Sequence, residues 1–81
     1  MEFPLYIDVI LMQDVPIEGL HAGDVGLVVE WHDVPGREMG VSVEFFDMLG
    51  NTVAVVTVPA SAVCAPTPGD RPTVRPPLVS G

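Results

Sequence analysis

The sequence contains no lysine, and three arginines are its only permanently cationic residues against eleven aspartates and glutamates. The formal net charge is −8 over 81 residues. A nucleic-acid-binding face needs cationic side chains to neutralise phosphates, and an anionic membrane surface attracts the same side chains. We therefore expect neither a nucleic-acid partner nor a membrane partner.

Cysteine and long apolar runs are equally scarce. The single cysteine, Cys64, excludes an intrachain disulfide and any paired-cysteine metal or redox motif. A membrane helix requires roughly 20 apolar residues, and the most apolar stretch, residues 53–66, is shorter and is interrupted by Pro59. Residues 1–8 lack the basic and apolar regions of a signal peptide. These features favour a protein of the reducing cytoplasm.

The distribution of proline divides the chain in two. Residues 1–65 carry the apolar periodicity and ten of the acidic residues, whereas residues 66–81 hold five of the nine prolines and two of the three arginines. Proline at that density disfavours helix and strand interiors and favours extended chain. We predict one small domain over residues 1–65 and an extended proline-rich tail over residues 66–81.

Two segments, residues 24–32 and 39–47, alternate between apolar and other residues with a period of two. This alternation is typical of half-buried antiparallel strands. The sides that we expect to face the core consist of Val25, Leu27, Val29 and Trp31 in the first segment and Met39, Val41, Val43 and Phe45 in the second.

Weaker signals complete an all-β fold. They predict an opening strand at residues 7–12, a further strand at 52–58, a 3₁₀ turn at 59–62 and a last strand at 63–65. Strands this short in so small a chain predict an SH3-like five-stranded barrel, because closure buries one core and hides the strand edges. An open, twisted meander completed by a partner is the alternative.

Two motifs stand in one register, namely Leu20-x-x-Gly23-Asp24-Val25-Gly26-x-Val28-Val29-Glu30 and Val43-Glu44-Phe45-x-Asp47-x-x-Gly50-x-Thr52-x-Ala54. Together they resemble a family of small bacterial proteins of unknown function, over about residues 8–63. The resemblance implies an SH3-like or KOW-like barrel without catalytic residues. Some members of that family are encoded beside genes for suspected toxins, which implies an antitoxin-like role.

Residues with the chemistry for catalysis or metal binding form no recognisable constellation. His21, His32 and Cys64 are spaced like no zinc site, and Ser42 and Ser61 belong to no triad-like pattern. Pairing any two of the carboxylates as acid and base is arbitrary without a pocket. We predict no catalytic, metal or cofactor site, and no enzyme.

Apolar residues on the predicted outward side of consecutive strands are the least expected feature of the sequence. The candidate interface consists of these residues and the two acidic residues beside them: Val28, Phe46, Val53, Val55, Glu30 and Glu44. A contiguous exposed apolar patch marks an interface. We therefore predict a noncatalytic, acidic module that binds a protein partner through an outer sheet face.

The identity of the partner stays open at this point. One hypothesis is an antitoxin-like or immunity-like protein that neutralises a basic toxin, with the acidic residues steering association. The alternative is a small accessory subunit or maturation factor of a larger enzyme. A homodimer formed through the same patch is a further possibility.

Overall fold

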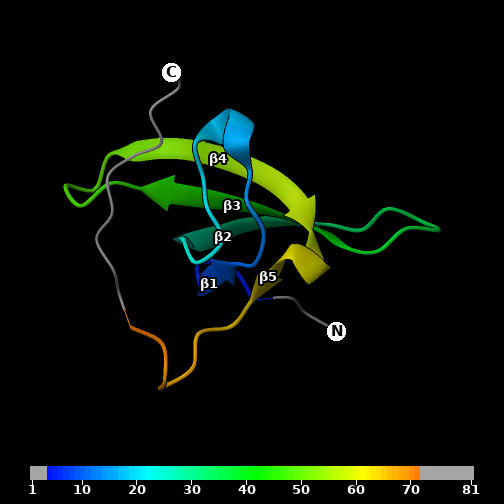
Figure 1. The fold of residues 1–81 in the computed structure, drawn as a ribbon. Coiled ribbons are helices and arrows are strands. Elements are labelled where there is room, and N and C mark those ends of the chain that lie inside the picture. The colour runs from blue at the N-terminus through cyan, green and yellow to red at the C-terminus, as the bar shows by residue number, and fades with distance from the viewer. Residues whose placement is uncertain (1–3, 72–81) are drawn as a thin grey trace.

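The computed structural model describes residues 4–71, which form an antiparallel five-stranded sheet and two short 3₁₀ helices (Figure 1). The strands are β1 (Asp8–Leu11), β2 (Val25–His32), β3 (Gly40–Phe46), β4 (Thr52–Pro59) and β5 (Val63–Cys64), and the 3₁₀ helices are η1 (Pro16–Glu18) and η2 (Ala60–Ala62). The all-β class and all five predicted strands are confirmed, each strand to within one residue at either end. Of the predicted tail, residues 66–71 contain no strand or helix, and residues 72–81 lie outside the described part.

The sheet is open, so the prediction of a closed barrel was wrong. Its strand order is β4-β3-β2-β1-β5, and within residues 4–71 no ladder joins the two edge strands β4 and β5. The two residues of β5 pair with β1, and Pro66 shortly afterwards has no N–H with which to extend a ladder.

Within residues 4–71, no helix is long and apolar enough to cross a membrane.

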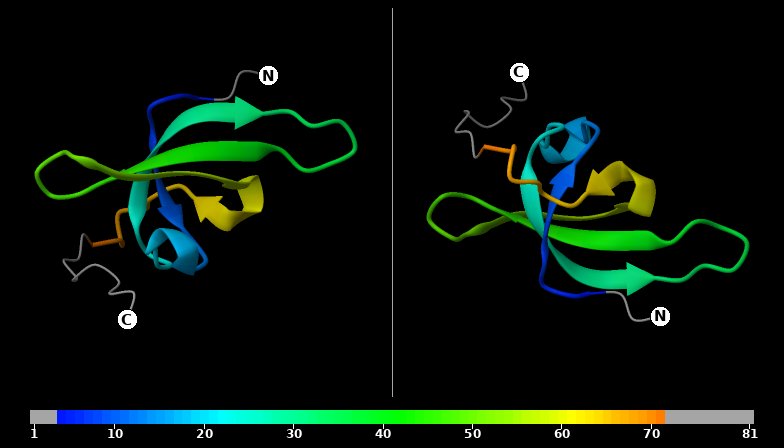
Figure 2. Two further views of the ribbon diagram at one scale, coloured as in Figure 1. Left: turned by 90° about the horizontal axis from the view of Figure 1, so that it is seen from above. Right: turned by 90° about the horizontal axis from the view of Figure 1, so that it is seen from below.

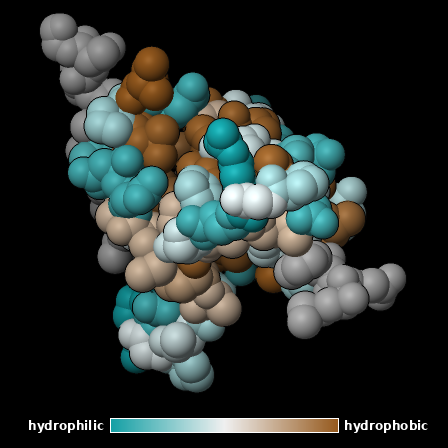
Figure 3. All heavy atoms as spheres, turned by 90° about the vertical axis from the view of Figure 1, so that its right-hand side faces the viewer, coloured by the Kyte–Doolittle hydropathy of each residue, from teal (hydrophilic) through white to brown (hydrophobic). Residues whose placement is uncertain are grey.

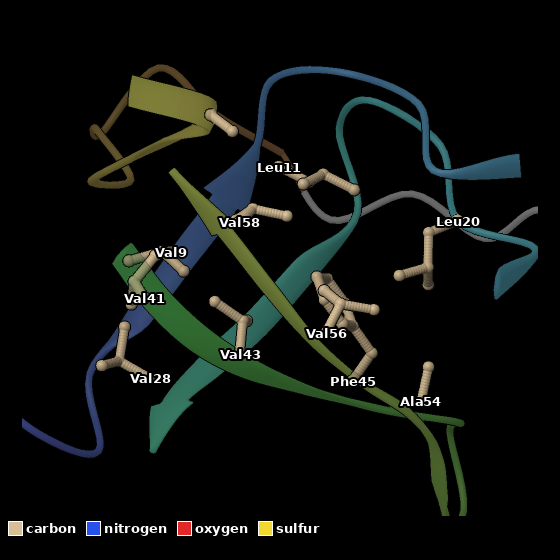
Figure 4. Packing of buried hydrophobic residues seen from close by; sticks show 11 residues of the cluster. Val9, Leu11, Leu20, Val28, Val41, Val43, Phe45, Ala54, Val56 and Val58 are labelled. Atoms are coloured by element: carbon tan, nitrogen blue, oxygen red, sulfur yellow. The ribbon is translucent and has the colours of Figure 1, made fainter. Parts of the chain in front are cut away.

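The core lies inside the bend of this sheet. In the views of Figure 2, β1 and β5 lie on one side of β3 and β4, so that a single sheet covers the core from both sides. Figure 4 shows the side chains of β1 and of the loop after it converging with those of β3 and β4. The buried apolar residues are Val9, Leu11, Leu20, Val28, Val41, Val43, Phe45, Ala54, Val56, Val58 and Ala62.

The first half of β2 faces the core with the opposite side from the one predicted. Val28 is fully buried, whereas Val25 is 51% exposed. Gly26 is buried as well, because a Cβ at this position would overlap Val43 Cγ1 and come within 2.9 Å of Phe45 Cε1. A glycine therefore belongs on the inner side here, where it leaves space for two core side chains.

A β-bulge restores the predicted side in the second half of the strand. The register between β2 and β3 shifts between Val28 and Glu30, so Val29 is an extra residue. Beyond it Trp31 packs against the core, and its Nε1–H donates to the carbonyl of Pro4 at 2.7 Å. The prediction of which side chains face the core was thus correct for Trp31 and wrong for the start of β2, because the extra residue of a bulge reverses the alternation.

Candidate functional site

The outer face, which is the side of β2, β3 and β4 directed away from the core, carries three of the four predicted apolar interface residues. Phe46 is 42% exposed, Val53 56% and Val55 55%. We call these three residues the apolar patch. The fourth residue, Val28, is fully buried, so its assignment to the interface was wrong, for the reason given by the reversed side of β2.

The strand register places the apolar patch at the hairpin end of β3 and β4. Phe46 lies opposite Thr52, and the register shifts between Phe45 and Phe46. This shift leaves Val53 as an extra residue on β4. The patch is therefore built on two hydrogen-bonded strands and not on a loop.

The two predicted acidic residues lie on the outer face at different places. Glu44 is half-buried and pairs with Leu27 of β2 and with Val55 of β4. Its Oε2 accepts a hydrogen bond from the hydroxyl of Thr52. Glu30 is exposed on β2. Glu44 thus borders the apolar patch directly, whereas Glu30 is farther along the sheet.

The loop between β3 and β4 extends the apolar surface with two residues that the sequence interpretation missed. Met48 is 86% exposed and Leu49 is 88% exposed. Only Asp47 separates them from Phe46 along the chain, so the tip of the hairpin adds two exposed apolar side chains close in sequence to the apolar patch. The available signal was the occurrence of two adjacent large apolar residues within a predicted turn.

The Asp47 side chain accepts three hydrogen bonds within this loop. Asp47 Oδ1 accepts from the backbone N–H groups of Leu49 and Asn51, each at 2.9 Å. Its Oδ2 accepts from the Asn51 side chain at 3.1 Å. Gly50 adopts a φ of 86°, which a glycine accommodates at no steric cost. The backbone and side-chain hydrogen bonds from Asn51 lower the pKa of Asp47 below its ordinary value of 3.8.

A row of polar side chains crosses the other end of the outer face. Ser42 Oγ lies 2.7 Å from His32 Nε2 and 2.7 Å from Thr57 Oγ1. These hydrogen bonds connect β2, β3 and β4, and Ser42 is only 7% exposed. The row therefore links neighbouring strands, as cross-strand polar pairs do.

The geometry of this row differs from that of a nucleophile activated by a base. Glu30 Oε1 lies 3.9 Å from His32 Nε2, the same nitrogen that contacts Ser42. In a triad the carboxylate binds the opposite ring nitrogen, where it orients the imidazole. The contact between Ser42 and His32 accordingly supports a structural interpretation of both residues.

The remaining candidates for metal binding lie apart from one another. His21 is in the loop before β2, where its backbone N–H donates to Asp24 Oδ2 at 2.9 Å. Cys64 is an exposed free cysteine on β5. Within residues 4–71, no group of three or more His, Cys, Asp or Glu side chains is placed to hold a metal ion.

Comparison with protein-family models gives a match that covers most of the described residues. The family model described as "Domain of unknown function (DUF4926)" matches residues 5–64, a range that includes all five strands and ends at the last residue of β5. No curated protein and no solved structure gives a significant match. The chain belongs to the DUF4926 family of domains of unknown function.

Proposed function

We propose that this protein is a noncatalytic module that binds a protein partner through the apolar patch and the adjoining hairpin tip. The observation that carries the proposal is the number of large exposed apolar side chains at one hairpin, where Phe46, Met48 and Leu49 lie within four residues of the chain. Soluble proteins rarely expose large apolar residues side by side unless another surface covers them. This hairpin lies at the left-hand end of Figure 1. Figure 3 shows the opposite end of the molecule, where hydrophobic and hydrophilic residues are intermixed.

The charge of the chain indicates a basic partner. Glu44 borders the apolar patch and Asp47 lies at the hairpin tip, and the sequence contains no lysine. Acidic groups around an apolar centre raise the rate of association with a cationic protein and disfavour acidic partners. A basic toxin neutralised by an antitoxin-like or immunity-like protein is the most concrete form of this proposal.

An SH3-like arrangement of the strands is part of the same proposal. The strand order β4-β3-β2-β1-β5, the long loop between β1 and β2, and the placement of η2 directly before β5 support it. Many unrelated functions share one small β architecture, so this likeness does not select among them. We also propose that the protein acts in a reducing compartment, because its only cysteine is free and exposed.

The proposal is tested by quantitative affinity capture from cells of the source organism with the tagged full chain. Phe46→Ser and Leu49→Ser should each reduce recovery of the partner by about tenfold or more, because central apolar anchors dominate interface energetics. Ile17→Ser is the matched control, since Ile17 is 91% exposed on η1, outside the apolar patch.

Two results distinguish the alternatives. Undiminished capture by both variants, with intact circular dichroism, contradicts the proposal. The other result is that a large enzyme is recovered with the wild-type chain in a fixed stoichiometry and is lost with both variants. That result would assign the protein as an accessory subunit or maturation factor of this enzyme.

A further inference from the structure

Strand β4 lies at one edge of the sheet and has a partner on one side only. It pairs with β3 from Thr52 to Pro59, and within residues 4–71 no other strand pairs with it. The backbone N–H and C=O groups on its other side are therefore open to an added strand.

The hydrogen-bond pattern identifies which backbone groups are available. Just beyond β4, the N–H of Ala60 donates to the carbonyl of Met39 at 2.8 Å. Bonded positions recur at every second residue of an antiparallel pair, and this register is unbroken along β4 back to Ala54. Val55 and Thr57 fall between the bonded positions, so their N–H and C=O groups point to the free edge.

This edge lacks the features with which proteins normally prevent pairing. Natural edge strands carry charged residues, internal prolines or bulges, or are very short. Strand β4 has eight residues, none of them charged, and its only proline is the last residue, Pro59. Its one register shift lies at its beginning. The opposite edge, β5, has only two residues.

We infer that the free edge of β4 binds an extended segment of a basic partner protein as an added strand. The inference rests on the proposed function and specifies how the partner is held. Backbone hydrogen bonds to Val55 and Thr57 bind the added strand, as in other cases of β-strand addition. The exposed side chain of Val55 offers an apolar contact beside it.

Acidic residues around β4 favour an added strand that carries cationic residues. Asp47 precedes β4 in the hairpin loop, and Glu44 pairs with Val55. Beyond the other end of β4, Glu38 accepts hydrogen bonds from Ser61 N–H and Oγ at 3.1 and 3.0 Å. Cationic residues flanking an extended segment complement these carboxylates, whereas a second copy of this chain presents the same negative charges to them.

The test uses the full-length ¹⁵N-labelled chain and an acetylated, amidated peptide of alternating valine and threonine with a lysine at each end. Amide hydrogen exchange of Val55 and Thr57 should slow on addition of this peptide. Val56 and Val58 already bond to β3 and should change little. Peptides with glutamate at each end, or with proline replacing threonine, should leave Val55 and Thr57 unprotected.

Two substitutions of Val55 distinguish the contribution of its backbone to binding from that of its side chain. Val55→Pro removes an N–H that does not bond to β3 and should weaken peptide binding by about tenfold or more. Val55→Thr keeps that N–H and should bind almost as well as the wild-type chain. Equal weakening by both variants assigns binding to the side chain and overturns the inference. If Val55→Pro does not fold, the exchange data on the wild-type chain still decide.

The remaining outcomes are equally informative. Peptide-induced changes confined to Phe46, Met48 and Leu49 overturn strand addition and leave the proposed function standing. The same conclusion follows if Phe46→Ser loses partner capture while the amides of Val55 and Thr57 stay unprotected in the complex captured with the wild-type chain. Protection of Val55 and Thr57 without peptide, together with a doubled mass in analytical ultracentrifugation, shows that a second copy occupies the edge and overturns the assignment to a basic partner.

Discussion

Replacing Gly26 by alanine tests the packing of β2 most sharply. A Cβ at this position would overlap Val43 Cγ1, come within 2.9 Å of Phe45 Cε1 and lie 3.1 Å from the backbone oxygen of Glu44. Val43 is fully buried and Phe45 is 2% exposed, so neither side chain has free space into which to move. One added methyl group therefore forces the β2–β3 pair apart or pushes core side chains off their rotamers.

The expected loss is about 2–3 kcal/mol, the cost of inserting an extra group into a packed core. A domain of this size has a total stability of about 5–15 kcal/mol, and the corresponding decrease in Tm is about 10–20 °C. Thermal unfolding followed by far-ultraviolet circular dichroism, with urea titration for the free energy of unfolding, measures both quantities.

Gly40→Ala is the matched control, because Gly40 also lies in a strand without a positive φ. A Cβ there would have His32 Cβ as its nearest neighbour, at 3.5 Å, an ordinary van der Waals distance. The control should gain less than about 1 kcal/mol through reduced freedom of the unfolded chain. Equal melting of the Gly26 and Gly40 variants would place Gly26 at the surface and refute the assigned side of β2.

Three further predictions concern other parts of the molecule. Val28→Ala should lower the free energy of unfolding by about 2 kcal/mol, whereas Val25→Ala should change it by less than about 0.5 kcal/mol; the opposite ranking in urea titrations would restore the side first predicted for β2. Ser42→Ala should cost about 1–2 kcal/mol, because it removes the hydroxyl that joins three strands, and an unchanged unfolding curve would show that the polar row contributes nothing. Asp47 has a lowered pKa, so its stabilising contribution is present above its ordinary value of 3.8 and disappears as the pH falls through the lower folded value. The protection of the Asn51 amide, measured by NMR as its exchange rate relative to the intrinsic rate at the same pH, should decrease over that acidic range, and Asp47→Ala should abolish this decrease.

Sequence periodicity was sufficient for β3 and β4. Apolar residues at every second position of these strands are buried, with Val43 and Val56 among them. The predicted sides were correct although Ser42 is buried as well and the register shifts at the start of β4. In β2 the same reasoning failed at two residues. Gly26 has no side chain to mark its side as inner, and the bulge at Val29 reverses the alternation partway along the strand.

The candidate site was predictable only in part, for related reasons. The exposed positions of Phe46, Val53 and Val55 follow from alternation in β3 and β4. Met48 and Leu49 were missed because turn residues around them indicated only a loop, and periodicity says nothing about exposure within a loop. The open sheet was the alternative to the predicted barrel, and the sequence did not decide between them, since closure depends on which edges pair and not on the pattern within any one strand.

The most direct test of the proposed interface is an amide hydrogen-exchange footprint of the captured complex compared with the free chain. The surface defined by the apolar patch and hairpin tip predicts slower exchange along β4 and through residues 46–51, with unchanged exchange in η1. Slower exchange confined to the loop between β1 and β2, with residues 46–59 unchanged, would contradict the assignment of this face as the binding surface.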